Sequence, residues 1–551
     1  LNMFVSSEFS SAAAISFPAK PEAKFDGSGT EADPYLIKSI ADLKALAVAV
    51  NTDASKRGSA KTDIQDDQYY PVYEGKYFAL DTDLDFSAYK ETFQPIGTSS
   101  IRFAGTFDGR GHTINKLQFL DYAYDYVGLF GATAPEATVK NLRFANPKIT
   151  TVGYNVGILA GRNFGTVDNV TVDSATISAS GYNVGLIGGY NFGKISNVKA
   201  HKASISALGY VGGVAGFCYG DITSCSVEGA TIQLVSKQQF AGGIAGYMSR
   251  VKGHANSKLL DCSFSGTVYS SASEICLGGI AGEVAYTEVA RCYTAARILS
   301  GASVQNYIAG LVGAAWVCDI HDCYATGVVD NANSAFAAGL VSEDPETDDS
   351  YGGTTITNCY AAVELTTAST DSIAGLVGKP AHITVKNSYF DTQLAGFGHS
   401  DWGKTTAQLT DAAGISGFDA SVWNFTAGLY PRIKATDSTN VAVVSASPII
   451  LAATDNVKQV KNDFTYSTAG GVEWRAVKNG FYSTEGGYAF NFADGTAKLN
   501  YQQYTDTVEV RRGNSSKLYF VNIAPMPFKG EGTAESPWEI GTREEFKQLV
   551  N

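Results

Sequence analysis

The stretch VGLIGG at residues 184–189 decides the fold, because similar short boxes of apolar residues and glycine recur along the chain. The boxes end at these positions: Gly131, Gly161, Gly189, Gly216, Gly246, Gly282, Gly313, Ser342 and Gly378. Successive boxes lie 27 to 36 residues apart. An internal repeat with a period in this range is the signature of a solenoid, a propeller or a similar array.

A second box follows each first one, as in TVKNLRF at 138–144 and TITNCYA at 355–361. Its alternating apolar residues predict a strand with one buried face. Two short strands per repeat cannot bury that face alone, whereas stacked coils can, each coil pairing with the next at about 4.8 Å. A propeller blade would need about 40 residues and four strands. The sequence therefore predicts an all-β chain whose body is a parallel β-helix with coils of about 30 residues.

The composition agrees with this fold and argues against several functions. Of 551 residues, 58 are glycine, only 14 are proline and 17% are charged. Many glycines and little charge are typical of β-rich structure with frequent turns. The formal net charge of −13 argues against a nucleic-acid partner, because no basic stripe could neutralise phosphates. No apolar run reaches the length of a membrane-spanning helix, so we expect no membrane span.

The start of the repeats needs a cover, because open strand edges template aggregation. The stretch SIADLKALAVAVN predicts a capping helix at about 39–50. Ser39 and Asp42 have the spacing of a capping box, which satisfies the first free N–H groups of a helix. Leu43 and Leu46 lie on the apolar face that would pack against the first coil. Residues 1–24, which precede this region, are expected to be an N-terminal extension or linker.

The segment after the repeats has a different pattern. Residues 435–525 carry alternating strands such as VEWRAV and YAFNFA. Strands at this spacing predict an Ig-like β-sandwich. TVEVRRGNSSKLYFVNI reads as a hairpin around Gly513 and Asn514, and it resembles bacterial Ig-like spacer domains.

The end of the chain repeats its beginning. FKGEGTAESPWEI at 528–540 is a near copy of FDGSGTEADPYLI at 25–37. Residues 526–551 are therefore expected to start a second β-helix module, in which case the chain is a piece of a longer tandem protein. Alternatively they are an orphan capping tail, and residues 527–551 let copies of the chain self-associate.

The boxes resemble GLUG motifs, the Gly-Leu-(any)-Gly repeats of bacterial surface proteins that are common in Bacteroidetes. VGLFG with TVKNLRF, and IAGLVG with DIHDCYATG, match closely. The resemblance covers residues 25–434, with repeats at about 120–390 and a closing segment at 388–434. It implies an adhesin-like protein that is extracellular or on the bacterial cell surface. GLUG repeats also accompany IgA-specific metallopeptidases, whose His-Glu-x-x-His motif this sequence lacks.

Tyrosines at one phase of the repeat are the first candidates for ligand binding. Tyr154, Tyr182 and Tyr210 lie 28 residues apart. They are either stacked rings that stabilise the coils or an exposed strip that binds sugar rings. Phe164, Phe192 and Tyr219 occupy a second phase, each followed by glycine.

Two long repeats carry charged insertions, and loops often carry recognition. MSRVKGHANSK at 248–258 is basic, and SEDPETDDS at 342–350 is acidic. The acidic residues form a candidate contact site or a solvated loop: Glu343, Asp344, Glu346, Asp348 and Asp349.

Five of the eight cysteines share one position of the repeat. Cys225, Cys262, Cys292, Cys323 and Cys359 share one phase of the second box, where earlier repeats have Leu or Val. A position that accepts these three residue types is a core position, so we expect buried free thiols in place of disulfides or zinc ligands.

Alternate acids in LDTDLDFS form the one candidate metal site. Asp81, Asp83 and Asp85 could hold Ca²⁺, or they could simply cap turns. No other cofactor is expected.

The sequence supports three hypotheses for function. The first is a secreted or cell-surface adhesin or stalk that is not an enzyme and binds a glycan or a surface protein through its β-helix faces and loops. The second is a carbohydrate-active enzyme, a polysaccharide lyase or glycosidase, whose catalytic residues would carry no local signature. The third is a subunit of an extracellular filament that assembles through the C-terminal tail.

Overall fold

The structure is a computed structural model. It describes residues 25–434, apart from short gaps at 90, 302–305, 332–335, 344–351, 368–372, 396–401 and 426–429, and a set of strands between 443 and 523. The predicted extension at 1–24 and the predicted tail at 526–551 lie outside the described residues.

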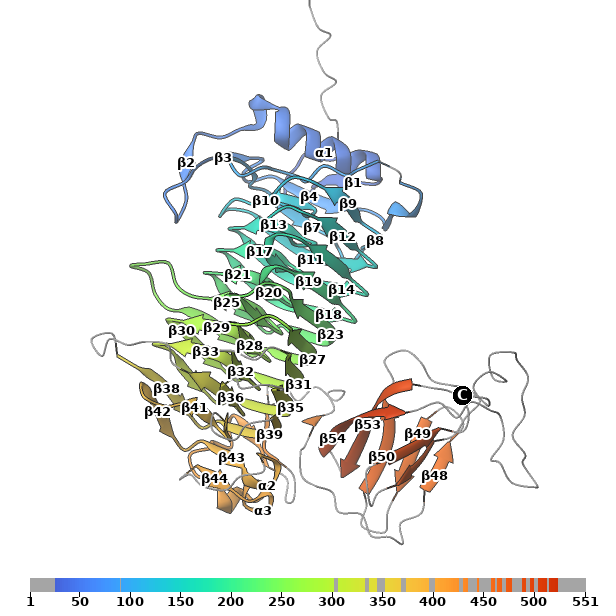
Figure 1. The fold of residues 1–551 in the computed structure, drawn as a ribbon. Coiled ribbons are helices and arrows are strands. Elements are labelled where there is room, and N and C mark those ends of the chain that lie inside the picture. Colours follow the sequence, from blue (N-terminus) through green and yellow to red (C-terminus); the bar gives the residue numbers. More distant parts are fainter. Residues whose placement is uncertain are drawn as a thin grey trace, which may run out of the picture.

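The body is a parallel β-helix, as the repeat predicts. Each full coil crosses three sheets of 25, nine and seven strands, and the coil-to-coil pairs in these sheets are parallel. In one coil, β14 (Thr166–Asp173) and β15 (Thr176–Ala179) belong to the 25-stranded sheet, β16 (Tyr182–Gly185) to the seven-stranded sheet and β17 (Gly188–Asn191) to the nine-stranded sheet. Figure 1 shows the coils stacked from α1 and β1 at one end to β43, α2 and α3 at the other.

The strands of the 25-stranded sheet are, besides β14 and β15, β1 (Tyr35–Ile37), β4 (Tyr77–Leu80), β5 (Leu84–Asp85), β7 (Thr106–Asp108), β8 (Thr113–Asn115), β9 (Gln118–Tyr122), β11 (Thr138–Ala145), β12 (Lys148–Thr151), β18 (Lys194–His201), β19 (Ser204–Ala207), β22 (Asp221–Thr223), β23 (Ser226–Leu234), β26 (Ser257–Leu260), β27 (Ser263–Ser270), β30 (Thr287–Ala290), β31 (Tyr293–Ser300), β34 (Asp319–His321), β35 (Tyr324–Asn331), β38 (Thr354–Thr357), β39 (Tyr360–Thr367), β42 (Ile383–Lys386), β43 (Tyr389–Asp391) and β44 (Gly403–Lys404).

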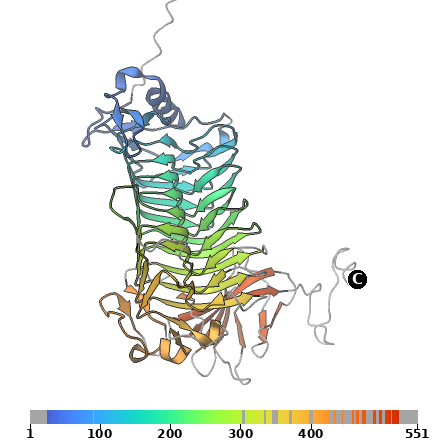
Figure 2. The same cartoon turned by 60° about the vertical axis from the view of Figure 1, so that its left-hand side comes forward.

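The nine-stranded sheet contains β10 (Phe130–Ala132), β13 (Ala160–Asn163), β17, β21 (Ala215–Cys218), β25 (Ala245–Met248), β29 (Ala281–Ala285), β33 (Val312–Trp316), β37 (Val341–Glu343) and β41 (Val377–Lys379). The seven-stranded sheet contains β16, β20 (Gly209–Gly212), β24 (Phe240–Gly242), β28 (Cys276–Gly278), β32 (Tyr307–Ala309), β36 (Phe336–Ala338) and β40 (Ile373–Ala374). Figure 2 shows the same stack from the side.

The glycine box forms the corner between the seven- and nine-stranded sheets. A Cβ atom added to Gly189 would lie 2.3 Å from the backbone nitrogen of Val156 in the preceding coil. The same contact recurs at Gly216, whose Cβ would lie 2.2 Å from Val184 N. Glycine is therefore required because two backbones meet at this corner with no room for a side chain.

This corner can be tested with two adjacent glycines. We expect Gly189→Ala to destabilise the coils by about 2 kcal/mol or more, since the new methyl group meets backbone that cannot move aside. Gly188→Ala is the matched control, because its Cβ would have no neighbour nearer than 3.8 Å. Thermal unfolding of the two variants measures the difference, and equal melting temperatures would contradict the role given to the corner.

The second box is bent, which its alternation does not predict. One residue in each repeat takes a left-handed backbone conformation with φ between 45° and 55°: Asn141, Asn169, Asn197, Ser224, Asp261, Arg291, Asp322, Asn358 and Asn387. Val167 and Val170 are consequently both buried although they are three residues apart. Asparagine tolerates this conformation better than most residues, and Asn169 Nδ2 donates a hydrogen bond to Asn141 Oδ1 at 2.7 Å.

The residue after each bend points into the core, and five of these residues are cysteines. All eight cysteines of the chain are buried and none forms a disulfide, which confirms the prediction of buried thiols for these five. The Cys323 N–H donates to Cys359 Sγ at 3.3 Å, one coil further along. The column thus acts as a polarisable part of the apolar core.

The N-terminal cap agrees with its prediction. Helix α1 (Ile40–Thr52) begins after Ser39, whose side chain accepts a hydrogen bond from the Asp42 N–H. Leu43 and Leu46 are buried against the coils. Strand β1 pairs with β4, so the segment before the helix forms the first strand of the large sheet. None of the described helices is long and apolar enough to span a membrane.

The closing segment folds back over a stack of tyrosines. Tyr324 and Tyr360 stack with centroids 5.0 Å apart and an interplanar angle of 2°. Trp423 and Tyr430 cover the stack, and Tyr360 Oη donates to Pro431 O at 2.8 Å. This segment contains α2 (Thr392–Ala395), α3 (Thr406–Leu409), β45 (Trp423–Asn424) and β46 (Arg432–Ile433). Three short strands pair near the N-terminal cap: β2 (Lys61–Thr62), β3 (Gln68–Val72) and β6 (Ile101–Phe103).

The strands after residue 434 form two separate sheets. Six strands make one sheet: β47 (Val443–Val444), β48 (Val457–Val460), β49 (Asp463–Ser467), β50 (Val472–Val477), β53 (Tyr504–Arg512) and β54 (Ser515–Ile523). β51 (Tyr488–Asn491) and β52 (Thr496–Leu499) make the other. β53 and β54 form the expected hairpin, with Arg512 opposite Ser515. The Ig-like sandwich itself stays a prediction.

Candidate ligand-binding face

Aromatic side chains gather where the seven- and nine-stranded sheets meet. We call this set the aromatic strip: Tyr154, Tyr182, Tyr190, Tyr210, Phe217, Phe240 and Tyr247. Ring centroids lie 4.9 Å apart between Tyr190 and Phe217, and 4.7 Å apart between Phe217 and Tyr247. Tyr210 joins the two sheets, because its ring lies 5.1 Å from that of Phe217. The bare glycine corner lets side chains from both sheets touch.

The predicted tyrosine ladder holds for two of its three members. Tyr154 and Tyr182 stack with centroids 5.6 Å apart and an interplanar angle of 8°. Tyr210 does not continue this column, since the β16–β20 register pairs Tyr182 with Gly209. The step between these coils is one residue shorter than the earlier one, so Tyr210 takes the left-handed position that Asn183 holds in the preceding coil.

The strip is partly open to solvent, as is Tyr219 of the second aromatic phase. Tyr154 is 46% exposed, and the other members of the strip are half-buried. Phe164 and Phe192, by contrast, are buried and stack at 4.5 Å. That pair stabilises the coils. The strip, in contrast, keeps part of its side-chain surface in water.

Four members of the strip were missed in the sequence: Phe240 and three residues of the nine-stranded sheet. Tyr190, Phe217 and Tyr247 each follow the last glycine of a box directly. Aligning the chain on those glycines would have found them, because the boxes fix the register of the nine-stranded sheet. Their strands pair in that register, Tyr190 with Phe217 and Phe217 with Tyr247.

The same column continues past the rings with charged residues. After Tyr247 the register runs through Glu283, Ala314, Glu343 and Lys379. Glu343 was expected in a solvated acidic loop, but it ends strand β37 and is only 7% exposed. It is paired with Ala314 on one side and Lys379 on the other, so it lies within the nine-stranded sheet and not in the loop. The rest of that candidate site lies outside the described residues: Asp344, Glu346, Asp348 and Asp349.

The buried Glu343 carboxylate is neutralised by a cation of this chain. Lys379 Nζ lies 2.9 Å from Glu343 Oε2. The same ammonium lies over the ring of Phe336 at 3.8 Å and over that of Tyr307 at 4.7 Å. Two aromatic rings and a carboxylate thus enclose one positive charge, which offsets part of the cost of burial.

Glu283 has no such partner. Among the described residues, no side-chain cation pairs with its carboxylate and no donor hydrogen-bonds to it. Burial, and then the charge of Glu343, raise the pKa of Glu283 from 4.5 to about 7. A carboxyl group with a raised pKa and no partner is a candidate functional group.

The Glu283 carboxyl should make stability depend on pH. Its folded-state pKa lies above the unfolded value. Below pH 4.5 the carboxyl is protonated in both states and does not affect the free energy of unfolding, whereas above pH 7 its charge lowers that free energy by the full amount. We expect Glu283→Gln to leave stability unchanged at pH 4 and to raise it by on the order of 2 kcal/mol at pH 8. Thermal unfolding across this range measures the effect, with exposed Glu31→Gln as control. A variant that is no more stable at pH 8 would show that the carboxylate is already compensated.

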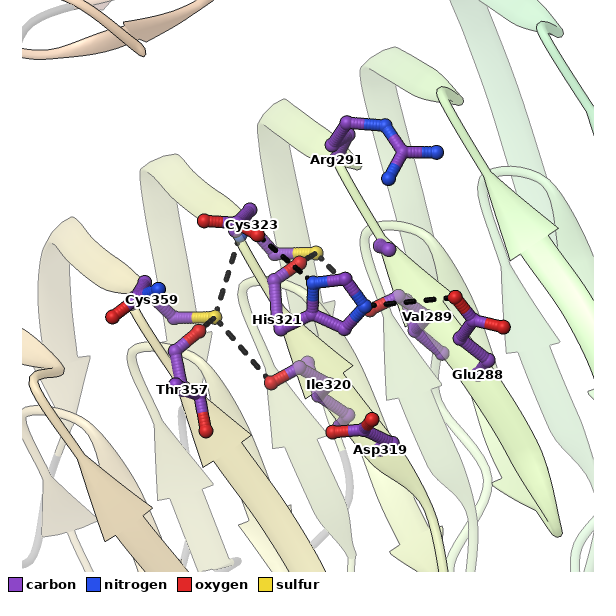
Figure 3. Close-up of polar contacts among 12 residues, drawn as sticks. Glu288, Val289, Arg291, Asp319, Ile320, His321, Cys323, Thr357 and Cys359 are labelled. Atoms are coloured by element: carbon purple, nitrogen blue, oxygen red, sulfur yellow. Dashed lines mark hydrogen bonds and ion pairs between the residues drawn. The ribbon is translucent and has the colours of Figure 1, made fainter. Parts of the chain in front are cut away.

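A second polar cluster lies on the 25-stranded sheet. His321 Nδ1 lies 2.9 Å from Asp322 Oδ2, and His321 Nε2 lies 3.6 Å from Glu288 Oε1. The Asp322 carboxylate, its nearest partner, raises the pKa of His321. Trp423 Nε1 donates to Asp322 Oδ1 at 3.0 Å, so the cluster ties the closing segment to the coils. Figure 3 shows His321 facing Glu288, with the thiols of Cys323 and Cys359 beside backbone groups.

The predicted calcium ligands each have a different partner. Asp83 Oδ1 accepts a hydrogen bond from the Thr113 N–H at 2.8 Å. Asp85 accepts one from the Ser87 N–H, and Asp81 lies 3.8 Å from Arg110. Across the described part of the chain, no group of three or more His, Cys, Asp or Glu could hold a metal ion. Calcium at Asp81, Asp83 and Asp85 stays a prediction.

Comparisons with known proteins give partial matches. No family model matches the chain. It is 30% identical over 148 residues to a "Putative Gly-rich membrane protein" of Evansella cellulosilytica, a match that covers 26% of this chain and 15% of that protein. It is 31% identical over 155 residues to "Halomucin" of Haloquadratum walsbyi, covering 26% of this chain and 2% of that protein. The chain thus spans only a small part of both relatives.

The comparison with solved structures gives a weak match. The matching structure is described as "a putative immunoglobulin A1 protease from Bacteroides ovatus" and is 19% identical, with a TM-score of 0.35. The match covers 75% of this chain and 95% of the other. The β-helix assignment above rests on the strand pairings of the chain itself.

Proposed function

We propose that this chain is a secreted or cell-surface adhesin or stalk of the GLUG type, without catalytic activity, that binds a glycan through the aromatic strip. The observation that carries the proposal is the strip itself. Seven aromatic side chains, six of them from the seven- and nine-stranded sheets, touch one another on a surface outside the apolar core. Aromatic side chains with a polar tip suit a ligand that has both apolar and hydroxyl-bearing faces, as sugar rings do.

The scaffold supports this use. Ladders of paired strands hold each ring at a fixed place, so little conformational freedom is lost when a ligand binds. The nine-stranded sheet spans on the order of 40 Å along the coil axis, since strands are about 4.8 Å apart. A rigid body of this length can carry a contact surface away from a cell.

Surface location and the C-terminal module are part of the same proposal. The names of the two relatives, a Gly-rich membrane protein and a halomucin, favour a place at the cell surface. The antiparallel strands between 457 and 523 favour an Ig-like spacer after the coils.

The strip can be tested by mutation. The wild-type chain should bind at least one glycan on an array of plant, microbial and host polysaccharides. We expect the triple variant Tyr154→Ala, Tyr182→Ala, Tyr247→Ala to weaken that binding at least tenfold, because truncated aromatic contacts often cost more than 1.4 kcal/mol. The control is Tyr269→Ala, a half-buried tyrosine on the 25-stranded sheet.

Two results would contradict the proposal. One is a wild-type chain that binds no glycan on the array, and the other is a folded triple variant that binds as the wild type does. Release of reducing or unsaturated sugar ends during the assay would instead identify a carbohydrate-active enzyme.

A further inference from the structure

We propose that Glu283 forms an ammonium-binding subsite at the end of the aromatic strip, so that the ligand is a glycan with free amino groups. The inference rests on the proposed function and names the class of glycan. Three features of the column that contains Glu283 support it. A lysine of this chain already binds a carboxylate in the same column, Glu283 has no such cation, and aromatic rings lie next to it.

The site of Lys379 shows how an ammonium group binds in this column. There the chain places its own ammonium 2.9 Å from the Glu343 carboxylate and over two rings, those of Phe336 and Tyr307. Lys379 follows Glu343 by one coil in the nine-stranded sheet. The fold therefore shows how a carboxylate at this corner accepts a positive charge from the next coil.

Glu283 has the equivalent place in this column without the cation, and Cys276 stands in the position that Phe336 has beside Glu343. The residue that follows Glu283 by one coil is Ala314, in the same register as Lys379 after Glu343. A methyl group supplies no positive charge. The free-energy cost of desolvating the Glu283 carboxylate can therefore be lowered in two ways: the group takes up a proton, or it pairs with a cation from another molecule.

The rings next to Glu283 belong to the aromatic strip. Tyr247 is its neighbour in the preceding coil, and the Phe240 ring lies 5.8 Å from that of Tyr247. Burial, and secondly the charge of Glu283, raise the pKa of Tyr210 and of Tyr247. The carboxylate is therefore close enough to both side chains to influence their ionisation. A glycan that lies along the strip would bring its next substituent to this carboxylate. A primary ammonium there would gain an ion pair and aromatic contact together.

The experiment compares two ligands that differ only at the amino group. Glucosamine tetramer and N-acetylglucosamine tetramer are titrated into the full chain at pH 6.5 by calorimetry. We expect the wild type to bind the amino form about tenfold more tightly, the size of a typical charged hydrogen bond. Glu283→Gln should bind both tetramers equally, at the affinity that the wild type has for the acetylated form.

A second variant keeps the test clear of folding defects. Ala314→Lys places an ammonium beside Glu283, as Lys379 does beside Glu343, and should abolish the preference without removing the carboxylate. Circular dichroism checks that both variants are folded.

The outcomes separate this inference from the proposed function. Equal binding of the two tetramers by the wild type and by Glu283→Gln would overturn the ammonium subsite and leave glycan binding in place. Equal loss of both tetramers in a folded Glu283→Gln would also overturn it. No binding of either tetramer overturns the amino-sugar assignment, and the array then decides whether any glycan binds. A lysine-rich peptide that binds through Glu283 where the amino tetramer does not would overturn the glycan as source of the ammonium.

Discussion

The close approach of two backbones at the glycine corner is the constraint on which the rest of the structure depends. At Gly189 and Gly216 the chain of one coil passes against the preceding coil with no space for a Cβ atom. This contact sets the sharp angle between the seven- and nine-stranded sheets. It also fixes the register of both sheets, and register decides which side chains stack. The aromatic strip and the charged column beyond it are consequences of that geometry.

Stacked side chains from successive coils stabilise the core in some places and form part of the surface in others. The Tyr324–Tyr360 stack is covered by Trp423 and contributes to the core of the closing segment. The stack of Tyr154 and Tyr182 in the aromatic strip has similar spacing, but part of its surface is in water. Glu283 shows a cost of such a surface, because a half-buried carboxylate without a partner lowers stability at neutral pH.

Much of the fold could be predicted from the sequence because the glycine boxes repeat with a recognisable period. The coils, the thiol column after Leu142 and Val198, and the cap at Ser39 all followed from spacing and side-chain chemistry. The candidate site was harder to predict from the sequence, because its composition depends on the strand register to within one residue. A step one residue shorter moved Tyr210 out of its expected column, and strand β37 drew Glu343 from an expected loop into the corner. The left-handed bend at Asn169 also breaks the alternation that a plain strand would show.

A crystal structure of the chain with its tightest-binding array glycan tests the central claim most directly. The account predicts density for sugar rings along Tyr154, Tyr182 and Tyr247, at the corner of the seven- and nine-stranded sheets. Density over the 25-stranded sheet or at the charged loops, with the strip unoccupied, would contradict it.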